Sequence, residues 1–444
     1  MTTFDQLALT AQLKRALAQE GHDTPTPIQA AAIPPALDGK DILGIAQTGT
    51  GKTAAFLLPL LNQIASHRQR PAPKTARALI LTPTRELAVQ ILDRVAAYSK
   101  GTKASRALVI GGASMNQQRR ALSRGVDVLV ATPGRLVDLV KRDWCDLSHT
   151  EFLVLDEADQ MLDMGFIHAI RHLRSCLPDQ IQSLLFSATM PKQIERFVAE
   201  MLVDPVRVEV TPVSKTADKV EQSVLFVSQT GKPAALAEIL RQDDVERVLV
   251  FARTKHGADK IVKSLATKDI EAAAIHGNKS QNARQRALNR FAKGELRVLI
   301  GTDIAARGID IKGITHVVQY DLPEVPETYV HRIGRTARAE ASGVAIALCS
   351  AGERHLLKAI EKVTRLTIPV AEGSAEQTDD EIAKAKAEAT RNRQQRGRRP
   401  GPRPGSRNTA KRPPKDGRSK SGNAGPSRRP KRKGAARPKT AVAK

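Results

Sequence analysis

Two segments of the sequence carry residues suited to binding a triphosphate. The first is the run AQTGTGKT, residues 46–53, which follows the apolar segment DILGI and precedes the helical pattern AAFLLPLLNQI. Glycines in such a loop let backbone N–H groups approach phosphate oxygens, the lysine neutralises their charge, and the last hydroxyl can bind Mg²⁺. Although Ala46 replaces the first glycine of the general pattern, the flanking segments predict a phosphate-binding loop. Its candidate residues are Thr48, Gly49, Thr50, Gly51, Lys52 and Thr53.

The second segment is LVLDEAD, residues 153–159, an apolar run that ends in acids. An aspartate at the carboxyl end of a strand beside a phosphate loop can hold Mg²⁺, and a neighbouring glutamate can orient or deprotonate the attacking water. We assign these roles to Asp156 and Glu157. The alternative is a cluster of helix-capping acids, because the same residues open the helical run ADQMLDMGF. Their position downstream of a phosphate loop favours catalysis.

Such residues must be positioned by a scaffold, and the apolar pattern indicates which one. Short apolar runs alternate with helical patterns: DILGIA, ALILT, VDVLVAT, EFLVLD and SLLFSAT come first, then RVLVF, EAAAIHG, LRVLIGTD, THVVQY and GVAIALCS. This rhythm is typical of parallel α/β structure. A polar stretch, residues 211–219, separates the two sets, so we predict α/β domains at residues 1–210 and 220–370.

The formal charge of +25 is unevenly distributed along the 444 residues. Residues 391–444 contain 20 Lys or Arg and one acid, a net +19, whereas the other 390 residues carry +6. Because Pro, Gly, Ser, Arg and Lys dominate this end, we expect residues 371–444 to be a disordered basic tail. A cationic block attracts polyanions, above all nucleic acid; a tail that is merely solvated is the alternative.

Cysteine usage and hydropathy bear on the compartment. The three cysteines, Cys145, Cys176 and Cys349, share no metal-ligand spacing, so neither a disulfide framework nor a zinc site is indicated. No apolar run reaches the ~18 residues of a membrane span, and the first residues lack the pattern of a signal peptide. We expect a cytoplasmic protein with no membrane partner.

The motifs, taken in order, resemble the DEAD-box ATP-dependent RNA helicase family of superfamily 2 over about residues 4–370. Besides AQTGTGKT and DEAD, the chain contains PTPIQ, PTRELA, GG, TPGR and SAT, then VLVFARTK, QNAR, TDIAARGIDI and HRIGRTAR. Each motif alone is weak, but their joint order is specific. The resemblance implies two tandem RecA-like domains that use ATP and Mg²⁺ to unwind RNA. The basic tail and the lack of a folded RNA-recognition module resemble the bacterial RhlE-like group.

For the nucleotide, the resemblance implies roles at particular positions. Gln29 reads the adenine edge, Phe4 stacks on the base and Asp310 contacts the ribose. Arg335 and Arg338 reach the γ-phosphate as arginine fingers, worth ~10³ or more in rate. The second domain has no phosphate loop, so one ATP per chain is implied.

Three further features concern coupling and departures from the family. His331 links ATP to the SAT residues Ser187, Ala188 and Thr189, which couple hydrolysis to unwinding. The family usually has an aromatic residue where this chain has His22, and glycine where it has Ala337. Alanine is tolerated there if its φ is negative.

RNA contacts implied by the resemblance involve hydroxyls, a glycine, an amide and guanidinium groups, which suit phosphates and sugars rather than bases. Aromatic residues make up only 3% of the chain, so base stacking is poorly supplied. We expect sequence-independent binding of single-stranded and duplex RNA. The implied residues are Thr84, Arg85, Gly112, Thr132 and Arg135 in the first domain, and Arg253, Thr254, Gln281, Arg284 and Thr302 in the second.

Two other functions remain open from the sequence. A DNA-acting helicase of the same superfamily is compatible with the tail charge, although PTPIQ and SAT favour RNA. An ATP-gated RNA clamp or scaffold that rarely unwinds would use the same residues. Ribosomal precursors and an RNA-decay complex are candidate partners, and ribosome assembly, RNA decay and cold adaptation are candidate settings.

Overall fold

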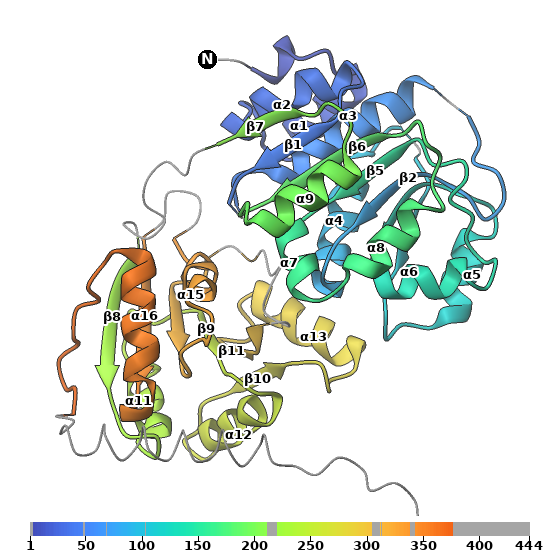
Figure 1. Ribbon diagram of the computed structural model, residues 1–444. Coiled ribbons are helices and arrows are strands. Elements are labelled where there is room, and N and C mark those ends of the chain that lie inside the picture. The colour runs from blue at the N-terminus through green and yellow to red at the C-terminus, as the bar shows by residue number, and fades with distance from the viewer. Residues whose placement is uncertain are drawn as a thin grey trace, which may run out of the picture. The chain divides into compact units, whose positions relative to one another are not determined.

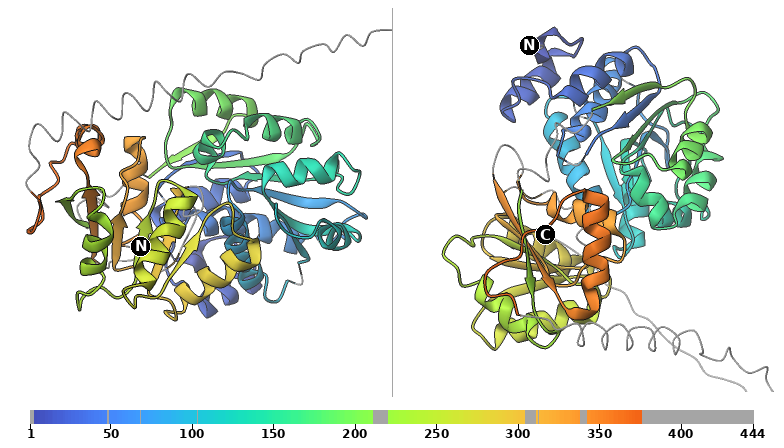
Figure 2. Two further views of the ribbon diagram at one scale, coloured as in Figure 1. Left: turned by 90° about the horizontal axis from the view of Figure 1, so that it is seen from below. Right: turned by 60° about the vertical axis from the view of Figure 1, so that its left-hand side comes forward.

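The computed structural model describes residues 3–47, 49–67, 69–102, 104–210, 220–303, 311, 313–337 and 342–375. These residues form two parallel β-sheets, each with helices on both faces (Figure 1; Figure 2). The predicted α/β class with two parallel sheets is confirmed. The predicted linker lies outside the described residues, as does the predicted tail beyond Ala375.

The first sheet has seven parallel strands in the order β3-β4-β2-β5-β6-β1-β7. The strands are β1 Ile42–Ile45, β2 Ala76–Leu81, β3 Arg106–Val109, β4 Val126–Ala131, β5 Phe152–Leu155, β6 Gln182–Ser187 and β7 Val206–Glu209. The helices are η1 Phe4–Gln6, α1 Ala11–Gln19, α2 Pro27–Leu37, α3 Lys52–Ser66, α4 Arg85–Tyr98, α5 Met115–Leu122, α6 Pro133–Val140, α7 Ala158–Asp163, α8 Ile167–Arg174 and α9 Lys192–Met201.

The second sheet has six parallel strands in the order β10-β11-β9-β12-β13-β8. The strands are β8 Val220–Phe226, β9 Val248–Phe251, β10 Ala272–Ile275, β11 Val298–Gly301, β12 His316–Gln319 and β13 Gly343–Cys349. The helices are α11 Lys232–Ile239, α12 Lys255–Ala266, α13 Gln281–Ala292, α15 Pro326–Ile333, η2 Ala351–Glu353 and α16 Arg354–Thr364.

Alternation along the strands divides the first domain into two cores. Val128 and Val130 of β4 pack with helices α1 to α4, whereas Leu129 and Ala131 pack with α5 to α9. Successive side chains of a strand point to opposite faces, so a strand buried on both faces is apolar throughout. This is why the central strands are continuous apolar runs in the sequence.

The fold brings the chemical motifs of the first domain to one edge of its sheet. In a parallel sheet, all strands end at the same edge, and ligands bind in the crevice outside these carboxyl ends. The phosphate loop follows β1, Thr84 follows β2, the glycine pair follows β3 and Thr132 follows β4. The acids follow β5, and the SAT segment closes β6.

Candidate active site and nucleic-acid interface

The phosphate loop joins β1 to α3 and is built on left-handed glycines. Gly49 has φ 89° and Gly51 has φ 94°, values that L-residues with side chains rarely adopt. Gln29 Nε2 donates to the Gly51 carbonyl at 3.0 Å, and Gln29 Oε1 accepts from Thr26 N at 3.0 Å. A Cβ added to Gly51 would lie 2.4 Å from Gln29 Nε2. Gln29 therefore fixes the end of the loop, and its predicted adenine contact stays a prediction.

Lys52, Asp156 and Glu157 form a buried charged cluster beside this loop, each at most 6% exposed. Burial raises the pKa of Asp156, an effect that the Lys52 charge opposes. Burial, and next the Asp156 charge, raise the pKa of Glu157 to about 7. Glu157 also has φ 55°, an uncommon conformation that costs about 1–2 kcal/mol.

Two atoms of this cluster indicate the kind of ligand that the site can bind. Among the described residues, Lys52 Nζ and Glu157 Oε2 are buried without a hydrogen-bond partner. Buried groups of this kind normally have partners, so their lack signals a polar group that the site is built to receive. Lys52 can bind the oxygens of a triphosphate, and the neighbouring acids suit Mg²⁺. The cluster therefore fits ATP together with a divalent metal.

Asp159, the last acid of the DEAD run, connects Asp156 and Glu157 to the SAT segment. Its Oδ2 accepts hydrogen bonds from Ala188 N at 3.2 Å, Thr189 N at 3.0 Å and Thr189 Oγ1 at 3.0 Å. Ser187 Oγ donates to the Thr189 carbonyl at 2.8 Å. A shift of the acids would therefore be transmitted to these residues. Nothing in the sequence pattern singles out Asp159, because about thirty residues separate it from its partners.

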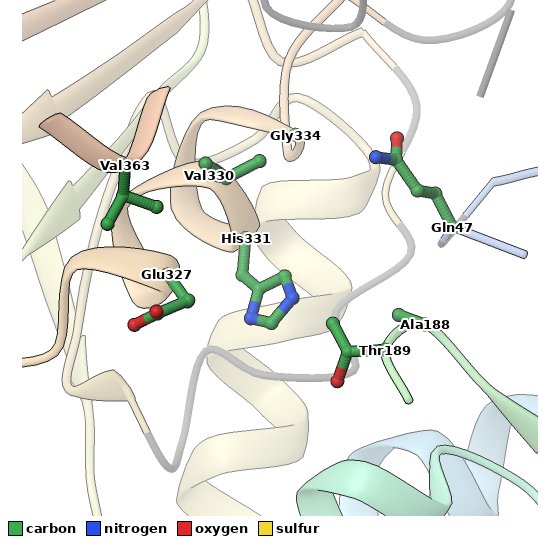
Figure 3. A pocket seen from close by; sticks show the side chains of 8 residues that line it. All are labelled: Gln47, Ala188, Thr189, Glu327, Val330, His331, Gly334 and Val363. Carbon is green, nitrogen blue, oxygen red and sulfur yellow. The ribbon is translucent and has the colours of Figure 1, made fainter. Parts of the chain in front are cut away.

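A pocket of about 200 Å³ brings the SAT segment together with α15 of the second domain. In Figure 3, the His331 ring projects from α15 into this pocket, on the side where Ala188 and Thr189 lie. Arg335, two residues beyond α15, is 3% exposed. Its positive charge is one of the influences that lower the pKa of Glu157. His331 and Arg335 thus lie on the side of the second domain that faces the acids.

Arg332, between these two residues, has a structural role that the sequence did not reveal. Its guanidinium forms a bidentate ion pair with Asp303, with Nε–Oδ1 at 2.6 Å and Nη2–Oδ2 at 2.9 Å. Nη1 donates to the Asp321 carbonyl at 2.7 Å and to Gln319 Oε1 at 3.2 Å. These bonds anchor α15 to the ends of β11 and β12, and so fix the helix that carries His331.

In the first domain, the predicted RNA residues gather at the starts of three helices. Thr84 caps α4 by accepting from Leu87 N at 3.2 Å, and Thr132 precedes α6. Arg85 lies against the glycine pair, since a Cβ on Gly112 would be 2.4 Å from Arg85 Nη1. Arg135 Nη1 donates to the Ala113 carbonyl at 3.0 Å. The structure therefore brings these five residues to one sheet edge, and their RNA contacts stay predictions.

In the second domain, the predicted RNA residues divide into two sets. Arg253 and Thr254 lie between β9 and α12, and Thr302 follows β11. Gln281 and Arg284 instead bind Glu86 of α4: Gln281 Nε2–Oε1 is 3.1 Å and Arg284 Nη2–Oε2 is 2.7 Å. Both side chains of the ion pair are nearly fully buried, and burial lowers the pKa of Arg284. A contact between the domains is thus made by residues predicted for RNA.

Several other residues named in the sequence analysis have local structures that differ from those expected, or lie outside the described residues. Phe4 is 5% exposed and packs in the core with α1 to α4, so its adenine stacking stays a prediction. The His22 ring contacts Tyr98, with Nε2 3.3 Å from the Tyr98 hydroxyl. Ala337 has φ 52°, so the condition for an inexpensive replacement of glycine is not met. Thr48, Asp310 and Arg338 lie outside the described residues.

The remaining features concern thiols and membrane association. Cys145 and Cys349 are buried, and burial raises the pKa of each thiol to about 12. In the part of the chain that the structure describes, no helix is both long and apolar enough to cross a membrane.

Comparison with known proteins identifies the class of this fold and site. A family model described as DEAD/DEAH box helicase matches residues 26–197, and one described as helicase conserved C-terminal domain matches residues 231–340. The DEAD-box ATP-dependent RNA helicase CshA of Bacillus cereus is 41% identical over 365 residues, which are 82% of this chain and 69% of the relative. The ATP-dependent RNA helicase DeaD of Mycobacterium tuberculosis is 43% identical over 371 residues, 83% of this chain and 65% of the relative.

Solved structures agree with these matches. Saccharomyces cerevisiae Dbp5 bound to RNA and ADP BeF3 gives a TM-score of 0.76 at 29% identity, covering 87% of this chain and 99% of that chain. Mss116 bound to ssRNA and UDP-BeF gives a TM-score of 0.76 at 25% identity, covering 87% of this chain and 83% of that chain. The chain belongs to the DEAD-box ATP-dependent RNA helicase family, with two RecA-like domains, which confirms the family resemblance and the predicted enzyme class. Its place in the RhlE-like group stays a prediction.

Proposed function

We propose that this chain couples RNA-stimulated hydrolysis of ATP to local, sequence-independent unwinding or remodelling of RNA duplexes and RNPs. The observation that carries the proposal is the buried cluster of Lys52, Asp156 and Glu157, whose neighbour Asp159 is bonded to the SAT segment. The cluster supplies the chemistry of hydrolysis, and Asp159 supplies a path by which its state reaches the rest of the molecule.

Each residue of the cluster has a role in hydrolysis. Lys52 binds the β- and γ-phosphates and neutralises their charge. Thr53 and Asp156 would hold Mg²⁺, which neutralises charge on the phosphates when bound. Glu157, with its raised pKa, orients the attacking water and accepts its proton. Arg335 stabilises the negative charge that develops on the γ-phosphate, and we assign the same role to Arg338.

RNA stimulation follows from a site shared by two domains. Arg335 belongs to the second domain and Glu157 to the first, so hydrolysis requires both domains to be together. RNA that binds residues of both domains favours this arrangement, and so does ATP. After hydrolysis, the γ-phosphate no longer links the two sides, and the RNA is released.

In this proposal, the protein binds RNA through the sugar-phosphate backbone. Arg85 and Arg135 at the first sheet and Arg253 at the second provide guanidinium groups that suit phosphates. Binding is therefore independent of sequence. As the cellular setting we propose ribosome assembly, RNA decay or cold adaptation in the cytoplasm, on the basis of the family resemblance.

The test is ATP hydrolysis by the purified full chain with no nucleic acid, with single-stranded RNA, and with DNA of the same sequence. We expect stimulation by RNA alone, and a rate lower by about 10²–10⁴-fold in Glu157→Gln. Strand displacement from a short RNA duplex is measured in parallel. Equal stimulation by DNA would favour a DNA-acting helicase, hydrolysis without displacement would favour an RNA clamp, and no stimulation by either would overturn the proposal.

A further inference from the structure

The second domain contains a buried lysine that the mechanism above does not use. Lys232, the first residue of α11, is 0% exposed. Its Nζ donates to the Tyr320 carbonyl at 2.6 Å and to Glu353 Oε2 at 2.6 Å, and lies 3.7 Å from Asp321 Oδ1. A buried charge is costly unless it is paired and hydrogen-bonded, and here it is both. Its main partner is Glu353.

Glu353 receives hydrogen bonds on both carboxylate oxygens. Oε2 accepts from Lys232 Nζ and, at 2.8 Å, from Ser350 Oγ, whereas Oε1 accepts from Arg253 Nη2 at 2.8 Å and Leu322 N at 3.3 Å. Burial alone would raise the pKa of Glu353, but the Lys232 charge and these bonds outweigh it and hold the pKa below its usual value. Glu353 is therefore ionised at neutral pH and connects a buried cation to a surface cation.

The surface cation is Arg253, which is held at two points. Its backbone N donates to Asp321 Oδ2 at 2.9 Å, and its Nη2 also donates to the Leu322 carbonyl at 3.3 Å. The side chain is still 41% exposed. Nη2 of the guanidinium is thus bonded inside the domain, while part of the side chain remains accessible to solvent.

Lys232 affects the field that Arg253 presents. An unpaired Glu353 would cancel the positive charge of Arg253 and repel a nearby phosphate. Lys232, Glu353 and Arg253 together carry +1, and Asp321, 3.7 Å from Lys232 Nζ, makes the group neutral, whereas without Lys232 the same group would carry −1. An immobilised side chain also loses less rotamer entropy when it binds a ligand, so fixing the guanidinium beforehand increases affinity.

We infer that Glu353, held and neutralised by Lys232, is a positioning residue that orients Arg253 toward an RNA phosphate. The inference rests on the proposed function, since it requires Arg253 to contact RNA. It assigns a purpose to a buried ion pair that lies apart from the phosphate loop. Glu353 acts only through Arg253 and touches neither ATP nor RNA.

The test is a double-mutant cycle read out by RNA-stimulated ATP hydrolysis of the full chain. Glu353→Gln keeps the side-chain shape and removes the charge. We expect the RNA concentration for half-maximal stimulation to rise about fivefold, with the maximal rate and the KM for ATP within about twofold of wild type. Arg253→Ala should raise this concentration at least as much. In the Arg253→Ala background, Glu353→Gln should have no further effect, because its target is gone.

Controls separate positioning from damage to the fold. Glu361→Gln is the matched variant, because Glu361 lies on the neighbouring α16 and its carboxylate accepts from Ile368 N at 3.1 Å, away from Arg253. It should leave RNA dependence unchanged. Thermal unfolding of every variant reports folding, and Glu353→Asp replaces Glu353→Gln if the latter does not fold.

Each failure has a different reading. If RNA does not stimulate the wild type, the proposed function and this inference both fall. If stimulation is normal but Arg253→Ala has no effect, Arg253 does not contact RNA. The inference is then wrong, while the proposed function stands. An unchanged or lower half-maximal concentration in Glu353→Gln overturns positioning, and so does an equal effect in both backgrounds.

Discussion

Glu157 combines an uncommon backbone conformation with an unpartnered carboxylate oxygen. With φ 55°, it precedes α7 and lies in a buried position where Oε2 has no hydrogen-bond partner. Strain and an unsatisfied group of this kind persist where the surrounding structure enforces them, which is common at catalytic sites. The two features suit a base that must hold one orientation and accept a proton near neutral pH.

This environment predicts a pH-dependent cost in stability when no ligand is bound. The pKa of Glu157 is raised to about 7, so the folded state prefers the protonated acid. Its contribution to stability is therefore fully present below the unfolded pKa of about 4.5 and is lost as the pH rises through about 7. Glu157→Gln is neutral throughout. We expect its advantage over wild type in urea unfolding to grow by about 2 kcal/mol between about pH 5.5 and 8.

Comparing Glu157→Gln with the wild type cancels the contribution of titrating groups that do not interact with Glu157, whereas Asp156, whose charge raises the pKa of Glu157, titrates together with it. Glu195→Gln, on the exposed face of α9, should follow the wild type at both pH values. An advantage of Glu157→Gln that stays constant with pH would contradict the raised pKa.

At the residue scale, the sequence indicated candidate chemical roles for single residues but not which distant residues would be in contact. Lys52, Asp156 and Glu157 were identified because each lies in a local motif whose residue types define its role. Asp159 and Glu353 were not, since their partners lie far along the chain and only the fold brings them together. Ala337 could not be judged either, because its φ of 52° depends on a turn that residue types alone do not specify.

At the scale of elements, sequence patterns predicted the central strands and one edge strand, β10, but missed the other three edge strands. β3 and β7 lie at the two edges of the first sheet and β8 at an edge of the second, and none of the three was predicted. Their burial alternates or is incomplete, as in β3, whose first residue is exposed. A half-buried edge strand needs fewer apolar residues than a strand covered on both faces, so its signal in the sequence is weaker.

The turn after β3 illustrates how two elements together form part of the proposed RNA site. Gly112 has φ 78°, and a Cβ there would be 2.4 Å from Arg85 Nη1 at the start of α4. Gly112→Ala should therefore displace the Arg85 guanidinium and strain the turn. We expect several-fold weaker RNA binding and a loss of about 1–2 kcal/mol in stability, measured by fluorescence anisotropy and urea unfolding.

Gly277 provides the matched control for this substitution. No atom outside its immediate neighbours lies within 4 Å of the position of an added Cβ, and its φ is not positive. Gly277→Ala should leave RNA binding and stability close to wild type. If Gly112→Ala binds RNA as tightly as Gly277→Ala, the turn does not position Arg85 for RNA.

At the scale of the whole chain, most of the positive charge lies in residues 391–444, outside the helicase motifs described above. Residues 391–444 carry a net +19, and the last of the helicase motifs, HRIGRTAR, ends before them. A tethered polycation raises the local concentration of RNA without reading its sequence. Salt weakens this attraction, because the release of counterions from RNA is less favourable when the salt concentration is high. The tail should therefore increase affinity most at low ionic strength.

We expect a chain whose tail Lys and Arg are replaced by Gln to bind single-stranded RNA about tenfold more weakly at about 50 mM salt. Above about 300 mM, the difference should shrink to about twofold, since the slope of log K against log salt falls by about 0.7 for each phosphate that the tail no longer neutralises. RNAs of unrelated sequence should respond alike, as measured by anisotropy. A difference that does not depend on salt would exclude the electrostatic tether.

The buried pair between Glu86 and Arg284 bears on how the whole molecule responds to its two ligands. Glu86 lies in the first turn of α4, and its carboxylate binds Gln281 and Arg284 in the first turn of α13. Removing one charge of a buried pair leaves the other uncompensated, which is strongly unfavourable. Glu86→Gln should therefore disfavour the arrangement in which the two domains are in contact, which is the arrangement that the proposed function requires for hydrolysis.

The consequence is measurable as a loss of coupling between ATP and RNA. In the wild type, RNA should tighten the binding of a non-hydrolysable ATP analogue by a factor between about 5 and 150, and the analogue should tighten RNA binding by the same factor, because coupling is reciprocal. In Glu86→Gln, both factors should fall together toward one. Glu200→Gln, which breaks an exposed ion pair with Arg171, is the control and should keep the wild-type factor. If Glu86→Gln weakens each ligand alone yet retains the full factor, Glu86 contributes to binding but not to coupling.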